Sequence, residues 1–160
     1  MPNLPALRPV NGLIPAMPPA TISSALRWEI AAVRNGYDDA PKTFSAAVKA
    51  EAAALRHALA PWAATVPERV LREWLAPIAN STRNPHPNAG AWLKGAFIAV
   101  GTLECIAFTE DTQREAMRTF TFFPAVADVY AIVGPVASEF RQKMAALNQI
   151  TEAPTTEAKS

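Results

Sequence analysis

The chain has 160 residues, of which half are hydrophobic, so it is long enough to build the core of one domain. Its formal net charge of +1 excludes a strongly basic nucleic-acid-binding surface. Its single cysteine, Cys105, excludes a disulfide within the chain and suits a reducing cytoplasm. Abundant alanine, few glycines and the absence of alternating β-branched runs predict an all-α fold.

Proline divides the chain. Six of the 15 prolines lie in residues 1–19, which we expect to form a flexible, irregular arm that could also serve as a docking segment. Residues 20–150 are predicted to form a single, compact helical domain of about six to seven helices. Residues 151–160 are predicted to be a disordered tail.

The first three helices are marked by caps and prolines. Thr21 or Ser23 caps a helix that runs to about Arg34 and ends at Asn35-Gly36. Asp38-Asp39 is predicted to form a turn, and a second helix is predicted from Pro41 to Leu59. A third helix is predicted to start at Thr65-Val66-Pro67-Glu68, with Thr65 as its capping residue. A polar loop from Asn80 to Asn88 ends this part.

The most apolar segment, Ala91 to Phe108, predicts a buried fourth helix. It is short for a membrane span and contains Lys94 and Glu104, so we expect no membrane insertion. Thr109 then caps a fifth helix from Glu110 to Arg118.

The stretch from Phe122 to Tyr130 has the clearest signals for the start of a helix. Proline disfavours the helical conformation in the residue before it, so Phe123 should be extended and Pro124 should take the first helical position. Asp128 falls in the first turn, where the helix dipole favours an anion. Gly134-Pro135 is expected to interrupt or kink the helix. Either both phenylalanines fill the core, or one of them is presented to a partner.

Catalytic patterns are missing from the sequence. His57 and His86 are interpreted as surface residues, without a second ligand at a metal-binding spacing. Cys105, in the most apolar helix, is interpreted as an inert hydrophobe. We therefore predict a protein that is not an enzyme and that needs no cofactor and no metal.

The arginines are interleaved with acidic residues, which favours a solvated face of mixed charge over a nucleic-acid-binding stripe. They lie around the third and fifth helices: Arg69, Arg72, Arg83, Arg114 and Arg118. We therefore do not expect nucleic acid to be a direct ligand. The four tryptophans are interpreted as core or interface anchors.

Two segments carry a resemblance, RTFTFFPAVADV at 118–129 and RQKMAAL at 141–147. They resemble small phage and prophage proteins of proteobacteria with a C-terminal FFP-x-x-A-E/D helix. This ending is similar to that of phage replicative helicase loaders and inhibitors, which are all-helical proteins. The chain departs from the pattern by having Asp128 in place of glutamate and by lacking the second proline of FPP.

The resemblance implies a phage protein, in the cytoplasm of a bacterial host, that binds and regulates a replication ATPase such as a replicative helicase. The implied partner-binding residues are Phe122, Phe123, Asp128, Tyr130, Arg114 and Arg118. Three alternatives stay open: an inhibitor that occludes a host defence or metabolic protein, a homo-oligomeric structural or packaging protein with the fourth helix as its seam, and, last, a DNA-binding protein, which the small net charge supports only together with a partner.

Overall fold

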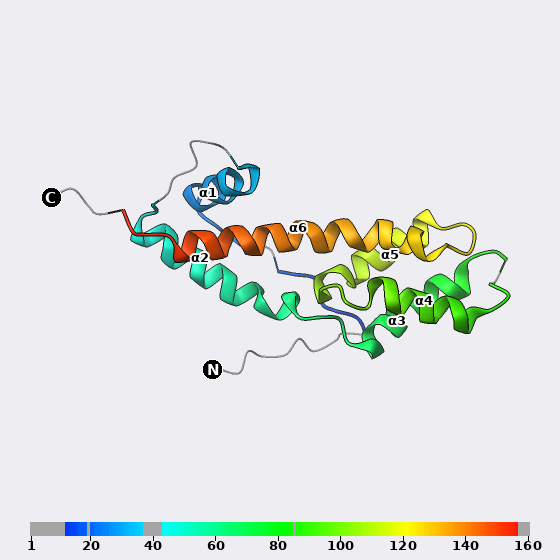
Figure 1. The fold of residues 1–160 in the computed structure, drawn as a ribbon. Coiled ribbons are helices and arrows are strands. Elements are labelled where there is room, and N and C mark those ends of the chain that lie inside the picture. Colours follow the sequence, from blue (N-terminus) through cyan, green and yellow to red (C-terminus); the bar gives the residue numbers. More distant parts are fainter. Residues whose placement is uncertain (1–11, 19, 37–42, 85, 157–160) are drawn as a thin grey trace. The chain divides into compact units, whose positions relative to one another are not determined.

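The computed structural model describes residues 12–18, 20–36, 43–84 and 86–156, and within these ranges it is all-α, as predicted (Figure 1). Isolated β-bridges occur, but no strand forms in the described part. The α-helices are α1 Ser24–Asn35, α2 Ala46–Leu59, α3 Glu68–Ser81, α4 Ala89–Val100, α5 Glu110–Thr119 and α6 Val126–Glu152; short 3₁₀ helices follow α2 (Ala60–Ala63) and α4 (Cys105–Ala107). None of the described helices is both long and apolar enough to cross a membrane.

The chain forms two compact units. The first unit comprises Met1–Met17 and Pro61–Ser138, and the second comprises Pro18–Ala60 and Glu139–Ser160. The part of helix α6 up to Ser138 therefore belongs to the first unit, and the part from Glu139 belongs to the second unit. Whether the two units together form the single domain predicted for residues 20–150 is not tested by this division, so the single domain stays a prediction.

In the second unit, the ends of α1 were predicted correctly. Ser23 is the N-cap, and its hydroxyl accepts a hydrogen bond from the Leu26 N–H at 3.1 Å. Gly36 adopts the left-handed conformation at the C-terminal end, with φ of 61°. The predicted turn at Asp38-Asp39 and the helix start at Pro41 lie outside the described residues. Helix α2 begins after Ser45, whose side chain caps it.

Glu51 of α2 clamps the start of α1. Its carboxylate accepts hydrogen bonds from the backbone N–H and from the hydroxyl of Ser23, each at 2.6 Å. The side-chain bond first, and the backbone bond second, hold the pKa of Glu51 below its usual range. The charged form is thus favoured in the folded state.

This clamp predicts a pH-dependent contribution to stability. Because the pKa of Glu51 is lowered on folding, its contribution is complete above the ordinary glutamate pKa of about 4.3 and is lost as the pH falls through the folded-state pKa. We expect Glu51→Gln to lower the melting temperature at pH 7, and the difference from wild type to vanish in strong acid. Thermal melts of both proteins from pH 7 to pH 2.5 measure this. A difference that persists unchanged at low pH would contradict the role of the charge.

The C-terminal segment forms structural contacts further along the chain than the sequence predicted. Helix α6 continues to Glu152, and the following residues pair with Phe44, which donates its N–H to Pro154 O at 3.2 Å and accepts from the Thr156 N–H at 2.9 Å. Lys49 also donates to Ala153 O. The predicted tail from Thr151 therefore contains ordered residues up to 156, because a buried Phe44 supplies the pairing partner. Its last four residues lie outside the described part.

In the first unit, α3 and α5 pack around Trp74. The Trp74 side chain is fully buried, and its Nε1–H donates to Thr109 O and to Thr112 Oγ1, both at 3.2 Å. Thr109 is also the N-cap of α5, as predicted. The ring meets Phe108 edge-on, with centroids 5.6 Å apart. A tryptophan of α3 thus fixes the start of α5.

The predicted capping role of Thr65 is wrong. The N-cap of α3 is Pro67, without a side-chain hydrogen bond. Thr65 lies two residues earlier, in an antiparallel bridge with Glu104. The acidic first turn at Glu68 is present, as expected.

The helix predicted from Ala91 to Phe108 is shorter in the structure. It ends at Val100, because Leu103 accepts a hydrogen bond from the Val66 N–H at 3.0 Å and Cys105 donates to Ala64 O at 2.8 Å. These pairings place Glu104 in an isolated bridge with Thr65, just before the 3₁₀ helix. Gly101 follows the helix, where a Cβ would collide with the carbonyl oxygen of Phe97.

Part of the N-terminal arm is docked on the first unit. Residues 12–18 are irregular, as expected, but Ile14 is buried and its N–H donates to Phe108 O at 3.4 Å. The Trp62 Nε1–H donates to Pro15 O at 3.0 Å. This stretch of the arm is therefore a structural element, while the earlier arm residues lie outside the described part.

The interruption predicted at Gly134-Pro135 is absent, because α6 runs through both residues, whereas the alternative, a kink at this point, stays a prediction. Pro135 lacks the N–H that would bond to the carbonyl of Ala131. Both Ala131 and Pro135 are exposed, so water can satisfy that carbonyl and the helix tolerates the proline. The Tyr130 ring lies over Gly134, where a Cβ would come within 2.7 Å of it.

Candidate functional site

The candidate site is built around residues 120–125, the non-helical segment between α5 and α6, which we call the FFP corner. Phe120, the first residue after α5, is extended, with φ of −94° and ψ of 101°. Pro124 precedes the helix by two residues, so its predicted first helical position is wrong. Val126 begins α6 instead, and the Asp128 carboxylate accepts a hydrogen bond at 2.9 Å from the N–H of Ala125, the residue just before the helix.

The two phenylalanines of the corner point in different directions. Phe123 is half-buried and packs edge-on against Trp92 of α4, with ring centroids 4.8 Å apart, and against His86 at 5.4 Å. Phe122 is 60% exposed. Of the two interpretations of the pair, core filling therefore describes Phe123, and display on the surface describes Phe122.

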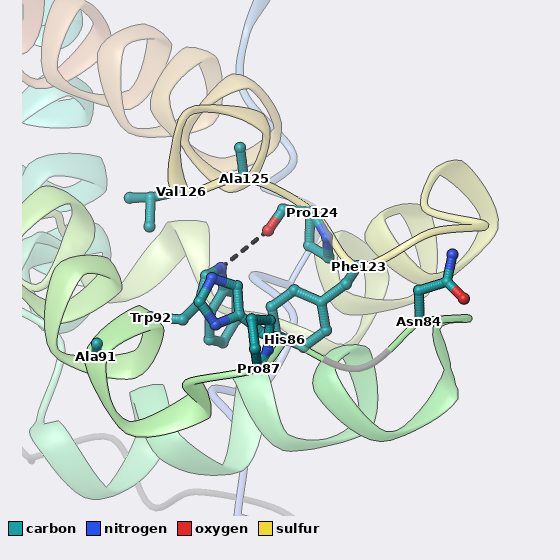
Figure 2. A pocket seen from close by; sticks show the side chains of 9 residues that line it. All are labelled: Asn84, His86, Pro87, Ala91, Trp92, Phe123, Pro124, Ala125 and Val126. Atoms are coloured by element: carbon teal, nitrogen blue, oxygen red, sulfur yellow. Dashed lines mark hydrogen bonds between the residues drawn. The ribbon is translucent and has the colours of Figure 1, made fainter.

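Two further contacts hold the corner. The Trp92 Nε1–H donates to Pro124 O at 2.9 Å, the bond drawn dashed in Figure 2. Arg83, in the loop after α3, donates its N–H to Thr121 O at 3.0 Å and accepts from the Phe123 N–H at 3.1 Å. Backbone and side-chain bonds thus fix the residues on both sides of Phe122.

An open hollow of about 610 Å³ lies beside the corner (Figure 2). It is lined by Asn84, His86, Pro87, Ala91, Trp92, Phe123, Pro124, Ala125 and Val126. Asn84 turns the loop with a positive φ of 56°, which asparagine tolerates. His86 accepts a hydrogen bond at Nδ1 from the Asn88 N–H at 3.0 Å, so the ring proton resides on Nε2.

The hollow can bind an apolar group, but its lining offers no pair of reacting groups. His86 is the single titratable side chain among the lining residues, and no nucleophile accompanies it. Within the described ranges, no cluster of three or more histidines, cysteines, aspartates or glutamates could hold a metal ion. Cys105 is buried away from the hollow, and desolvation raises the pKa of its thiol.

The remaining predicted site residues have diverse surroundings. Tyr130 is 46% exposed. Arg114 pairs with two carboxylates of its own helix, Glu110 at 2.7 Å and Asp111 at 3.3 Å. Arg118 is exposed in the last turn of α5. In the described part, no hydrogen bond, ion pair or ring contact joins any two of the six predicted residues.

His86 and Trp92 were not assigned to the site from the sequence. His86 was interpreted as a surface residue only, but its partly buried ring also packs against Phe123. Trp92 was predicted as a core anchor, which is correct, but its partner lies 31 residues further along the chain, and no local pattern shows such a pairing. His57, by contrast, is exposed, as predicted.

Comparison with known proteins adds no relative: no family model, no curated protein and no solved structure matches this chain.

Proposed function

We propose that the chain is a non-enzymatic phage protein that binds and regulates a replication ATPase through the FFP corner, with a replicative helicase as the first candidate. The observation that carries the proposal is Phe122, an exposed aromatic side chain on a fixed backbone. Aromatic anchors dominate the affinity of protein interfaces. An anchor that is already ordered loses little conformational entropy on binding.

The resemblance supplies the identity of the partner, and the contacts sort the six implied residues. Phe122, Tyr130 and Arg118 have exposed side chains that are available to a partner. Phe123, Asp128 and Arg114 have intramolecular contacts: Phe123 packs on Trp92, Asp128 caps α6, and Arg114 is ion-paired. We therefore assign direct contact to the first three and support of the surface to the others.

The test is capture of the purified replicative helicase by tagged protein, comparing wild type with Phe122→Ala. Loss of a central aromatic anchor costs about 2 kcal/mol or more, so we expect about 30-fold weaker binding. Trp28→Ala is the matched control, because Trp28 is 61% exposed but belongs to the second unit. Equal melting temperatures of the three proteins show that the fold is kept.

Two outcomes would contradict the proposal. One is a native protein that captures no helicase, and the other is a Phe122→Ala protein that captures it as well as wild type. Capture of a host defence or metabolic protein from lysate, lost with Phe122→Ala, would replace the helicase by the occluding inhibitor as the function of this corner.

A further inference from the structure

The exposed Phe122 has a cationic neighbour. Arg83 lies opposite it in a parallel bridge, which the backbone bonds to Thr121 and Phe123 define. Residues opposite each other in such a pair project from the same face, about 5 Å apart. Phe123 projects from the other face, where it packs on His86. Arg83 and Phe122 therefore form an exposed cationic and aromatic pair.

The charge around this pair is not neutralised by ion pairs. Arg83 and Arg118 are both exposed, and neither makes an ion pair within the described residues, whereas Arg114 is paired on its own helix. Two carboxylates are nearby in sequence. Asp128 accepts the Ala125 N–H, and Glu115 lies exposed one turn before Arg118. Among the described residues, Arg83 is thus an unpaired cation directly opposite Phe122, and Arg118 is a second unpaired cation four residues earlier in the chain; Glu115 and Asp128 are the carboxylates near them in sequence.

The backbone of Phe122 is also available. Because Arg83 bonds to Thr121 O and to the Phe123 N–H, the N–H and C=O of Phe122 face the opposite side of the segment. Neither group makes a hydrogen bond within the described residues. An extended chain can dock on such an edge through its own backbone and place alternate side chains toward the protein.

We propose that the element bound at the FFP corner is an extended acidic peptide segment with an apolar side chain. Its carboxylates meet Arg83 and Arg118, its apolar side chain packs on Phe122, and its backbone bonds to the Phe122 amide and carbonyl. The inference rests on the proposed function, that the corner binds a protein. It adds the chemistry of the segment that is recognised.

Charge favours a peptide over a nucleic acid at this surface. Single-stranded nucleic acid needs a continuous basic groove with several stacking rings. Here one aromatic ring is exposed at the corner, Glu115 interrupts the cations, and the whole chain has a net charge of only +1. A few carboxylates in an extended peptide match two arginines better than a continuous row of phosphates does.

The test is fluorescence anisotropy of the full-length protein with three labelled probes: the peptide Asp-Asp-Phe-Phe-Asp-Asp, whose extended form has an aromatic ring between two carboxylates on each face, the same peptide with lysine in place of aspartate, and a twelve-residue oligothymidylate. We expect only the aspartate peptide to bind, and more weakly at higher salt. Arg83→Gln and Arg118→Gln should each weaken it about tenfold. Glu115→Gln should strengthen it, because it removes the opposing charge.

Arg27→Gln is the matched control, since Arg27 is an exposed arginine without an ion pair in the described part of the second unit. It should leave the affinity unchanged. Equal binding of the lysine peptide, preferred binding of oligothymidylate, or no binding of any probe would overturn the inference. The peptide assay contains no helicase. A negative result in it can therefore be told apart from a negative result in the capture experiment, which tests the proposed function.

Discussion

Replacing Trp74 by alanine is expected to lower the free energy of unfolding by about 3–5 kcal/mol, the usual cost of deleting a buried tryptophan. The side chain is fully buried in the first unit, and it meets Phe108 edge-on. Its Nε1–H is shared by Thr109 O and Thr112 Oγ1. Truncation leaves a cavity between α3 and α5 and removes this donor. Urea unfolding followed by circular dichroism measures the loss.

Two variants make the Trp74 result specific. Trp28→Ala removes an equally large but exposed side chain, and we expect a change within about 0.5 kcal/mol. Trp74→Phe keeps most of the buried volume and removes the N–H, so its cost should lie between the other two. If Trp74→Ala were no more costly than Trp28→Ala, the assigned core between α3 and α5 would be incorrect.

The parts of the fold that the sequence predicts correctly are those with local causes. Ser23 and Thr109 cap the helices that follow them, and Gly36 ends α1, because each needs only its neighbours within one turn. The amphipathic patterns of the helices also arise from residues that are close together in the sequence. This explains why the all-α fold and the starts of α1 and α5 could be predicted directly from the residues.

The errors have tertiary causes. The apolar composition continues past Val100, so the sequence shows no helix end there, yet pairing of Leu103 with Val66 ends the helix. The polar residues after Glu152 look like a tail until Phe44, more than 100 residues earlier, pairs with them. Pro135 does not interrupt α6, and both it and Ala131, whose carbonyl lacks a donor, are exposed to solvent. In each case the local structure depends on a distant partner or on solvent exposure, and a local sequence pattern carries information about neither.

The site shows the same division. Phe123 is outside the helix, as the proline after it favours, and Asp128 lies in the first helical turn, where the sequence predicted it. Which of two adjacent phenylalanines faces solvent is decided by Trp92 and by the Arg83 loop, which approach from elsewhere in the chain. The sequence therefore indicated the corner, and tertiary contacts determine that Phe122 is the displayed residue.

Trp92 is expected to control how Phe122 is displayed. It is buried, packs edge-on against Phe123, and donates its Nε1–H to Pro124 O. Trp92→Ala should cost about 3–5 kcal/mol of stability. Trp92→Phe keeps a ring but leaves the buried Pro124 carbonyl without its donor, at a cost of about 1–3 kcal/mol.

The functional consequence is the sharper test, because Phe122 itself is unchanged in Trp92→Phe. A corner that has lost the bond to Pro124 should open more often, so the Phe123 amide, bonded to Arg83 O, should exchange its hydrogen faster. Partner binding should weaken as well, since ordering the corner then opposes association. The Lys49 amide in α2 of the second unit is the internal reference. An unchanged Phe123 amide together with weakened binding would mean that Trp92 contacts the partner directly instead of positioning Phe122.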